Sequence, residues 1–316
     1  MRGATPDAEI EALAARALAA GPISPAEAAR LCAGDPLLLG ALADAARRRL
    51  RGDAVVLVRV HSLEWTADGD PPPPSETPDE VRLEGPVPDG ATAADVRATL
   101  DRARAAVPGA PIRAVRPAEA LALAQAAGLP PRALLARLAD AGLATLALPS
   151  PADDPAATRA GLLAAHGAGL ATDAPIVYGP RAAPDALAAA ILAWRELPGA
   201  AERLRAAVPI PDSLPEQSPL TGTTGIEDLR ATACARLLLP SVPRVAVEAA
   251  LLGPKAACVA LSFGADTLAG AACVATARLT PADAEKPRAF NADRARRAVA
   301  ETGRPVAPPP PFPVRE

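Results

Sequence analysis

From residue 54 onward, short apolar runs alternate with longer helical segments, and this alternation constrains the fold more than any other feature of the sequence. The apolar runs, which predict strands, cover residues 54–60, 81–83, 111–115, 143–148, 174–178, 206–210 and 245–249. The helical segments between them cover 92–107, 117–141 with a break at 128–130, 155–169, 184–205 and 226–239. Strands that alternate with helices in this way favour parallel βα units.

The apolar run at 258–261 fits either a strand or a helix by composition alone. Pro254 suits the first position of a helix and Gly264 suits its end, and the alanines between them favour helix, so we predict a helix here. A short eighth strand then falls at 265–268. Seven clear strands and this weak one predict a (β/α)₈ barrel of the TIM type, with a doubly wound open sheet as the alternative.

The residues before the first strand show a helical pattern and predict a cap. Ser24 before Pro25 and Asp35 before Pro36 each offer an N-cap residue followed by a proline at the first helical position. Gly52 is suited to end the last of these helices. The sequence therefore predicts three parts, namely a helical cap over 1–52, a barrel over 53–270, and a C-terminal helix with a proline-rich tail over 271–316.

Composition argues against several functional classes. The net charge is −3, whereas a nucleic-acid binder usually carries a basic excess or patch. No stretch of about 18 apolar residues runs without a charge or a proline, so no membrane span is expected. The N-terminal residues are amphipathic and acidic and lack the apolar segment of a secretory signal. We therefore expect a cytoplasmic protein that binds neither nucleic acid nor membrane.

The cysteines and histidines do not form a metal motif in the sequence. The four cysteines are scattered through the chain at Cys32, Cys234, Cys258 and Cys273. Their spacing fits neither a disulfide framework nor a set of metal ligands a few residues apart. The histidines, His61 and His166, have no acid at ligand spacing. We therefore predict no metal site, and buried cysteines that pack as small apolar side chains are the simplest interpretation.

Residues 221–270 carry a resemblance to a known family. This segment reads TGTTGIEDLRATACARLLLPSVPRVAVEAALLGPKAACVALSFGADTLAG and resembles the C-terminal part of aminofutalosine synthase. That enzyme, a transferase, belongs to the radical S-adenosylmethionine (SAM) enzymes and to the futalosine route of menaquinone biosynthesis. A weaker resemblance covers 35–66, in which His61, Trp65 and Thr66 fall on the family's His, Tyr and Thr. The resemblance implies a radical-SAM-like barrel, with a [4Fe–4S] cluster and SAM as the family's cofactors.

The chain departs from this family where the family holds its cofactors. The family's three cluster cysteines form a CxxxCxxC loop directly after the first strand, whereas this chain continues there as Ala67-Asp68-Gly69-Asp70. A glycine pair that helps to hold SAM in the family is Gly85-Pro86 here. Because a [4Fe–4S] cluster needs thiolate ligands, we predict a degenerate member that has lost the cluster and SAM.

The ligand-site candidates are His61, Glu64, Trp65, Thr66, Tyr178, Gly222, Thr223 and Asp266. Four of them, His61, Glu64, Trp65 and Tyr178, are expected to form the mouth of the predicted barrel. Barrel active sites lie at the C-terminal ends of the strands, near which His61, Trp65 and Tyr178 are expected. A general-base role for His61 competes with a structural one, and pocket-lining roles for Trp65 and Tyr178 compete with simple packing. The segment 221–225 either presents backbone N–H groups to an anion or only starts a helix. No catalytic residue stands out.

The resemblance and the departures from it lead to two main hypotheses. The first is a non-catalytic partner or regulator of an active homologue or of another menaquinone-pathway enzyme, and the combined loss of cysteines and glycines favours it. The second is a protein that binds a futalosine-like or other small ligand, with or without non-radical chemistry. An active radical SAM enzyme with unusual cluster ligands ranks third. A closed mouth would count against ligand binding, and an exposed apolar patch would favour a partner.

Overall fold

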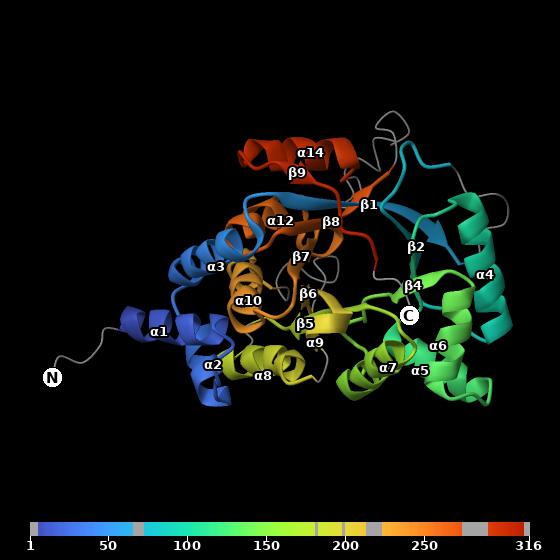
Figure 1. Cartoon of the computed structure of the whole chain (residues 1–316), viewed down its shortest axis with the longest axis horizontal. Helices are drawn as coiled ribbons and strands as arrows, with labels where there is room; N and C mark the ends of the chain where they lie inside the picture. The colour runs from blue at the N-terminus through green and yellow to red at the C-terminus, as the bar shows by residue number, and fades with distance from the viewer. Residues whose placement is uncertain are drawn as a thin grey trace. The chain divides into compact units, whose positions relative to one another are not determined.

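The fold is a (β/α)₈ barrel of the TIM type, as predicted (Figure 1). The computed structural model describes residues 6–65, 73–180, 183–197, 200–212, 223–273 and 290–312. Eight parallel strands, hydrogen-bonded in the order β4-β3-β2-β1-β8-β7-β6-β5, form a nearly closed barrel. The chain divides into two compact units, which are described separately: unit 1 holds residues 1–57, 173–270 and 293–307, and unit 2 holds 58–172, 271–292 and 308–316.

All eight predicted strands are present, with shifted ends. They are β1 (Val55–Glu64), β2 (Glu80–Glu84), β3 (Ile112–Ala114), β4 (Leu143–Leu146), β5 (Thr172–Tyr178), β6 (Leu204–Pro211), β7 (Arg244–Glu248) and β8 (Thr267–Ala272). The most consequential shift is in β1, which continues to Glu64 instead of ending at residue 60. A short strand that was not predicted, β9 (Val306–Ala307), pairs in parallel with Val55 and Val56 of β1.

The helices also follow the predicted order. They are α1 (Pro6–Leu18), α2 (Pro25–Cys32), α3 (Pro36–Arg51), α4 (Ala93–Ala106), α5 (Pro117–Ala126), α6 (Pro131–Asp140), α7 (Pro155–Gly167), α8 (Pro184–Arg195), α9 (Ala200–Arg203), α10 (Gly225–Leu238), α11 (Ala249–Leu252), α12 (Pro254–Ala260), the 3₁₀ turn η1 (Leu261–Phe263) and α14 (Ala292–Glu301). The ambiguous run at 258–261 is therefore helical. None of the described helices is long and apolar enough to cross a membrane.

The N-terminal helices begin and end at the predicted residues. The Ser24 hydroxyl accepts a hydrogen bond from the Glu27 N–H, and the Glu27 carboxylate accepts one from the Ser24 N–H, which forms a capping box at the start of α2. Asp35 caps α3 by accepting from the Leu37 N–H at 2.9 Å. Gly52, with φ of 73°, follows the last turn of α3 in a conformation that favours glycine.

The predicted helix over 184–205 is divided in the structure and ends two residues early. The helix α8 ends at Arg195, α9 covers Ala200–Arg203, and Leu204 and Arg205 already belong to β6. The sequence explains this interruption, because Pro198 and Gly199 lie within the segment and disfavour a continuous helix. The short helix α11 was not predicted at all. These errors concern segments in which apolar residues fit both a helix and a strand.

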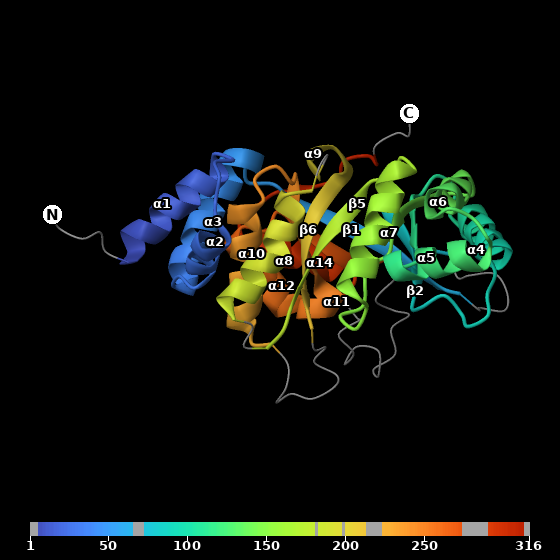
Figure 2. The same ribbon diagram turned by 90° about the horizontal axis from the view of Figure 1, so that it is seen from below.

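In unit 1, α10 is the centre of the helical layer. Almost every residue from Asp228 to Leu238 is buried, since α10 packs against α2, α3, α8 and β6 (Figure 2). Its alanine-rich sequence suits a helix that is covered on all sides. The approach of α3 to η1 depends on Gly40, because a Cβ there would lie 2.6 Å from the Phe263 ring. Unit 1 therefore joins the N-terminal helices firmly to α10.

In unit 2, α4 to α7 accompany β2, β3 and β4. The predicted break within 117–141 separates α5 from α6. A Cβ at Gly161 of α7 would clash with the Pro117 carbonyl, so these helices approach through a glycine. Arg113 of β3 forms a buried ion pair with Glu80 of β2 at 2.9 Å. The predicted division of the chain at residues 52 and 270 stays a prediction.

Candidate functional site

Three predicted site residues lie on or beside β1 in unit 2. His61 is a buried residue within the strand, Glu64 is its exposed last residue, and Trp65 follows directly. Trp65 is buried, and its Nε1–H donates to the Gly85 carbonyl at 3.2 Å. This contact gives Trp65 a packing role within unit 2, the alternative that competed with pocket lining. Thr66 lies outside the described residues.

Two further candidates, Tyr178 and Thr223, both contact Asp228 of unit 1, which was not predicted as a site residue. Tyr178 is the last residue of β5, and its hydroxyl donates to Asp228 Oδ1 at 2.7 Å. Thr223, which precedes the N-cap residue Thr224, also hydrogen-bonds to Asp228. The structure thus brings Tyr178 and Thr223 together through the first turn of α10. Gly222 lies outside the described residues.

The Tyr178–Asp228 pair is buried, and burial governs its protonation. Burial raises the pKa of Asp228 above its ordinary value, although the hydrogen bonds from Tyr178 and Thr223 act in the opposite direction. Burial and the neighbouring Asp228 charge raise the pKa of Tyr178 well above its ordinary value. Tyr178 therefore stays a protonated donor over the physiological range, and the pair holds the end of β5 against the start of α10.

A pocket of about 360 Å³ opens beside this pair. The end of α2, the end of β5, and the first turns of α8 and α10 form its wall. The lining residues are Ala33, Tyr178, Gly179, Ala183, Pro184, Leu187, Glu227 and Arg230. A mostly apolar wall with a few convergent polar groups is typical of small-molecule sites. This pocket is the candidate functional site.

Glu227 and Arg230 supply the charged groups of the pocket. Glu227 accepts from the Thr224 N–H at 2.6 Å in a second capping box, at the start of α10. Arg230 Nη1 donates to the carbonyl oxygens of Cys32 and Gly34, each at 2.8 Å. Arg230 thereby ties α10 to the end of α2. Sequence patterns gave no signal for Arg230, because its partners come from a distant helix.

Asp266 lies at the other end of the strands. It immediately precedes β8, whereas Tyr178 ends β5, and the strands are parallel. Asp266 is fully buried, its Oδ2 lies 2.9 Å from Arg236 Nη2, and its Oδ1 accepts from the Val245 N–H at 3.2 Å. The structure therefore gives this candidate an ion-pair partner and separates it from Tyr178 and Thr223.

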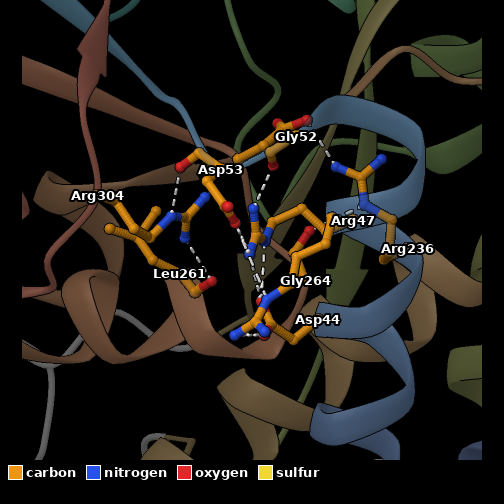
Figure 3. A network of polar contacts seen from close by, with 10 residues as sticks. Asp44, Arg47, Gly52, Asp53, Arg236, Leu261, Gly264 and Arg304 are labelled. Carbon is orange, nitrogen blue, oxygen red and sulfur yellow. Dashed lines mark hydrogen bonds and ion pairs between the residues drawn. The ribbon is translucent and has the colours of Figure 1, made fainter.

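Asp266 belongs to a group of charges that we name the arginine cluster, namely Arg47, Arg236 and Arg304 with Asp44 and Asp266. Arg47, Arg236 and Asp266 are buried, whereas Asp44 and Arg304 are partly exposed. Figure 3 shows Asp44 and the three arginines of this cluster. Arg236 Nε donates to the Gly264 carbonyl at 2.9 Å, and burial lowers the pKa of Arg236. Arg236 Nη2 and Asp266 Oδ2 are close but not aligned as a hydrogen bond, so their attraction is that of an ion pair. Arg47 pairs with Asp44, and Arg304 Nη1 donates to the Leu261 carbonyl at 2.8 Å.

The thiols do not fit the cluster that the resemblance implies. Cys32 and Cys234 are buried in α2 and α10, Cys258 is half-buried in α12, and Cys273 is buried after β8. A hydrogen bond with Cys32, together with burial, raises the pKa of Cys234, and burial raises that of Cys258, so both favour the neutral thiol. In the part of the chain that the structure describes, no three Cys, His, Asp or Glu residues are arranged to hold a metal ion.

Comparisons with known proteins give similarity in structure but not in sequence. No family model and no curated protein matches the chain. The crystal structure of methylornithine synthase (PylB) matches with a TM-score of 0.64 and 14% identity, over 93% of this chain and 97% of that one. HydG, a maturase of the [FeFe]-hydrogenase, matches with a TM-score of 0.65 and 11% identity, over 97% of this chain and 77% of that one. HydG from Carboxydothermus hydrogenoformans matches with a TM-score of 0.63 and 14% identity, over 95% and 79%.

At these identities the matches bear on the fold alone. The matches extend over nearly the whole of this chain. The barrel of this chain therefore has the same fold as methylornithine synthase and HydG.

Proposed function

We propose that this chain is a cluster-free relative of radical SAM enzymes that binds a small molecule in the pocket beside Tyr178. The pocket is the observation that carries the proposal, since a cavity of about 360 Å³ with apolar lining residues and an arginine is suited to a small molecule that carries a polar group. The resemblance of residues 221–270 to aminofutalosine synthase supports a role in or beside futalosine-pathway menaquinone biosynthesis.

The cluster-free part of the proposal is supported by the thiols. A [4Fe–4S] cluster on a radical SAM enzyme is held by three thiolates from one loop. Here three of the four cysteines belong to different helices, and two of these favour the neutral thiol. The segment that replaces the cysteine loop, from Ala67 to Asp70, contains no soft ligand.

A non-catalytic partner role is the second candidate, and exposed apolar side chains in unit 1 favour it. Leu37 of α3 is 71% exposed, Ile226 of α10 is 51% exposed and Val259 of α12 is 49% exposed. Large apolar side chains at such exposure are available to another protein. Purified aminofutalosine synthase should then associate with this chain in sedimentation experiments, and Leu37→Glu should weaken the association.

Anaerobic iron–sulfur reconstitution tests the cluster-free part. A radical SAM enzyme with an intact CxxxCxxC loop serves as the positive control, and calorimetry with SAM follows on the same samples. We expect the control to take up about four irons per chain and this chain far fewer. Iron that disappears in Cys258→Ser is adventitious, because Cys258 is the most accessible thiol. Four irons per chain with SAM binding would instead restore a radical SAM enzyme with unusual ligands.

Thermal melting with futalosine tests the ligand-binding part. A ligand that binds only the folded protein raises the melting temperature, by an amount that grows with its concentration. Ala183 is exposed and lines the pocket, so Ala183→Trp should fill the pocket and abolish the shift. Ala45→Trp, on the exposed face of α3, is the matched control and should keep it. An equal shift in both variants would place the binding elsewhere.

A further inference from the structure

Arg230 lines the pocket, and part of its guanidinium is not used in hydrogen bonds with described residues. Its Nη1 carries two hydrogens, and the carbonyl oxygens of Cys32 and Gly34 accept both. The remaining donors are Nε–H and the two hydrogens of Nη2. These donate to no protein group among the residues described, and Arg230 forms no ion pair with them. The unused edge is the one with which a guanidinium grips an oxyanion through two parallel hydrogen bonds.

We infer that the pocket recognises a small molecule that carries a single carboxylate, bound by the Nε–H and Nη2–H edge of Arg230. This inference rests on the proposed function and specifies the ligand class of the same site. Anchoring to α2 fixes the guanidinium before a ligand arrives, so little side-chain entropy remains to be lost on binding. Carbonyl groups orient Arg230, and among the residues that the structure describes no carboxylate pairs with its positive charge.

A carboxylate suits the charge balance of the pocket better than a phosphate. Glu227 also lines the pocket, in the first turn of α10. This acid opposes a second negative charge on the ligand, whereas one negative charge is matched by Arg230. The helix α8 begins at the same wall, and its N-cap residue Ala183 supplies no side-chain acceptor, so the positive helix end adds to the attraction for an anion.

The other lining residues determine the polarity of the ligand beyond its carboxylate. Ala33, Pro184 and Leu187 contribute apolar surface to the pocket. The only hydroxyl in the lining, that of Tyr178, donates to Asp228, so it offers the ligand an acceptor oxygen and no free proton. The expected ligand is therefore a compact monocarboxylate with a mainly apolar body.

Binding of matched acids and amides tests this inference. The probes are carboxylic acids of about 8 to 15 non-hydrogen atoms, a size suited to a pocket of this volume, each paired with its carboxamide. Ligand-observed NMR gives the dissociation constants, and the ¹⁵N–¹H signal of Arg230 Nε reports the contact directly in the unmodified protein. We expect acids to bind at least about tenfold more tightly than their amides, and only the acids to move the Arg230 signal.

Variants of Arg230 separate the effect of its two parallel N–H donors from the effect of its positive charge alone. Arg230→Met should abolish the preference for acids, and Arg230→Lys should weaken it, because a lysine keeps the charge but not the paired donors. Arg49→Met removes an exposed arginine of α3 and should change nothing. The Arg230 signal of the unmodified protein keeps the test decisive if a variant unfolds.

Each contrary outcome has a distinct meaning. Equal binding of acids and amides would overturn the carboxylate inference and leave the proposed small-molecule function standing. Tighter binding of inorganic phosphate than of the acids would also overturn it. If no probe of either kind binds while futalosine still raises the melting temperature, the carboxylate inference fails and the proposed function stands. If futalosine also gives no shift, both fail.

Discussion

The helix α10 provides two arginines, Arg236 and Arg230, that differ in burial and in the kind of partner that binds their guanidinium groups within unit 1. Arg236 is fully buried and lies 2.9 Å from Asp266, so its charge is matched inside the protein. Arg230 is only partly buried, and it is held by two backbone carbonyl oxygens that carry no net charge. A carboxylate partner neutralises an arginine, whereas carbonyl partners orient it and leave its charge for a ligand. The arginine cluster therefore serves the stability of the fold, whereas Arg230 in the pocket keeps a positive charge with which to bind an anionic ligand.

The largest expected effect comes from removing the charge of Asp266. Asp266→Asn keeps the shape of the side chain but leaves Arg236 buried without its counter-charge, which should lower the free energy of unfolding by about 3–5 kcal/mol. Urea denaturation measures this loss. Binding of carboxylate probes at the pocket should stay unchanged in the folded variant, since Asp266 lies at the other end of the strands.

The double variant Asp266→Asn/Arg236→Met sharpens the same comparison. With both charges gone, no uncompensated charge remains buried, so most of the lost stability should return. A double variant as unstable as Asp266→Asn alone would mean that Asp266 acts mainly through its hydrogen bonds with Val245 and Thr267.

A smaller effect is expected at the pocket from Tyr178→Phe. The change removes the hydrogen bond to Asp228 Oδ1 and should lower the free energy of unfolding by about 1–3 kcal/mol, because the lost bond is to an ionisable group. Chemical denaturation of the two proteins at neutral pH gives the difference. A variant as stable as the parent would show that Asp228 finds another donor without cost.

The smallest effect is a difference in pH dependence between the parent and Asp228→Asn. The raised pKa of Asp228 means that the native carboxyl prefers its proton, so its contribution to stability is complete in acid and is lost as the pH rises through the native pKa. The asparagine side chain of the variant does not titrate. From about pH 3 to pH 7 the parent should therefore lose stability relative to the variant. Parallel stability curves would contradict the assigned direction of the shift.

The sequence predicted those features that neighbouring residues determine. The starts of α2 and α3 were found because Ser24 and Asp35 cap their own helices, and the strands were found because apolar runs bounded by turn residues mark buried strands. The failures over 184–205 and at α11 are equally local. There, apolar residues fit two kinds of secondary structure, and packing decides between them.

The candidate site was largely beyond prediction, because it depends on contacts between distant segments. Arg230 and its partner Cys32 are 198 residues apart in the chain, and Tyr178 and Asp228 are 50 residues apart. Tyr178 was identified because it ends a strand, and Thr223 because it starts a helix. Asp266 was included for its place in a segment that resembles a known family, and no local pattern showed that Arg236 would neutralise it.

The pairing of β9 with β1 has a consequence for how the chain is made. Val306 pairs with Val55, and Arg304 donates to the Asp53 carbonyl, 251 residues earlier in the sequence. During synthesis the N-terminal helices and the first residues of β1 leave the ribosome long before these partners exist. Unit 1 can therefore close only after residue 307 has been synthesised, and until then the beginning of β1 lacks its β9 partner and keeps that edge open to other chains.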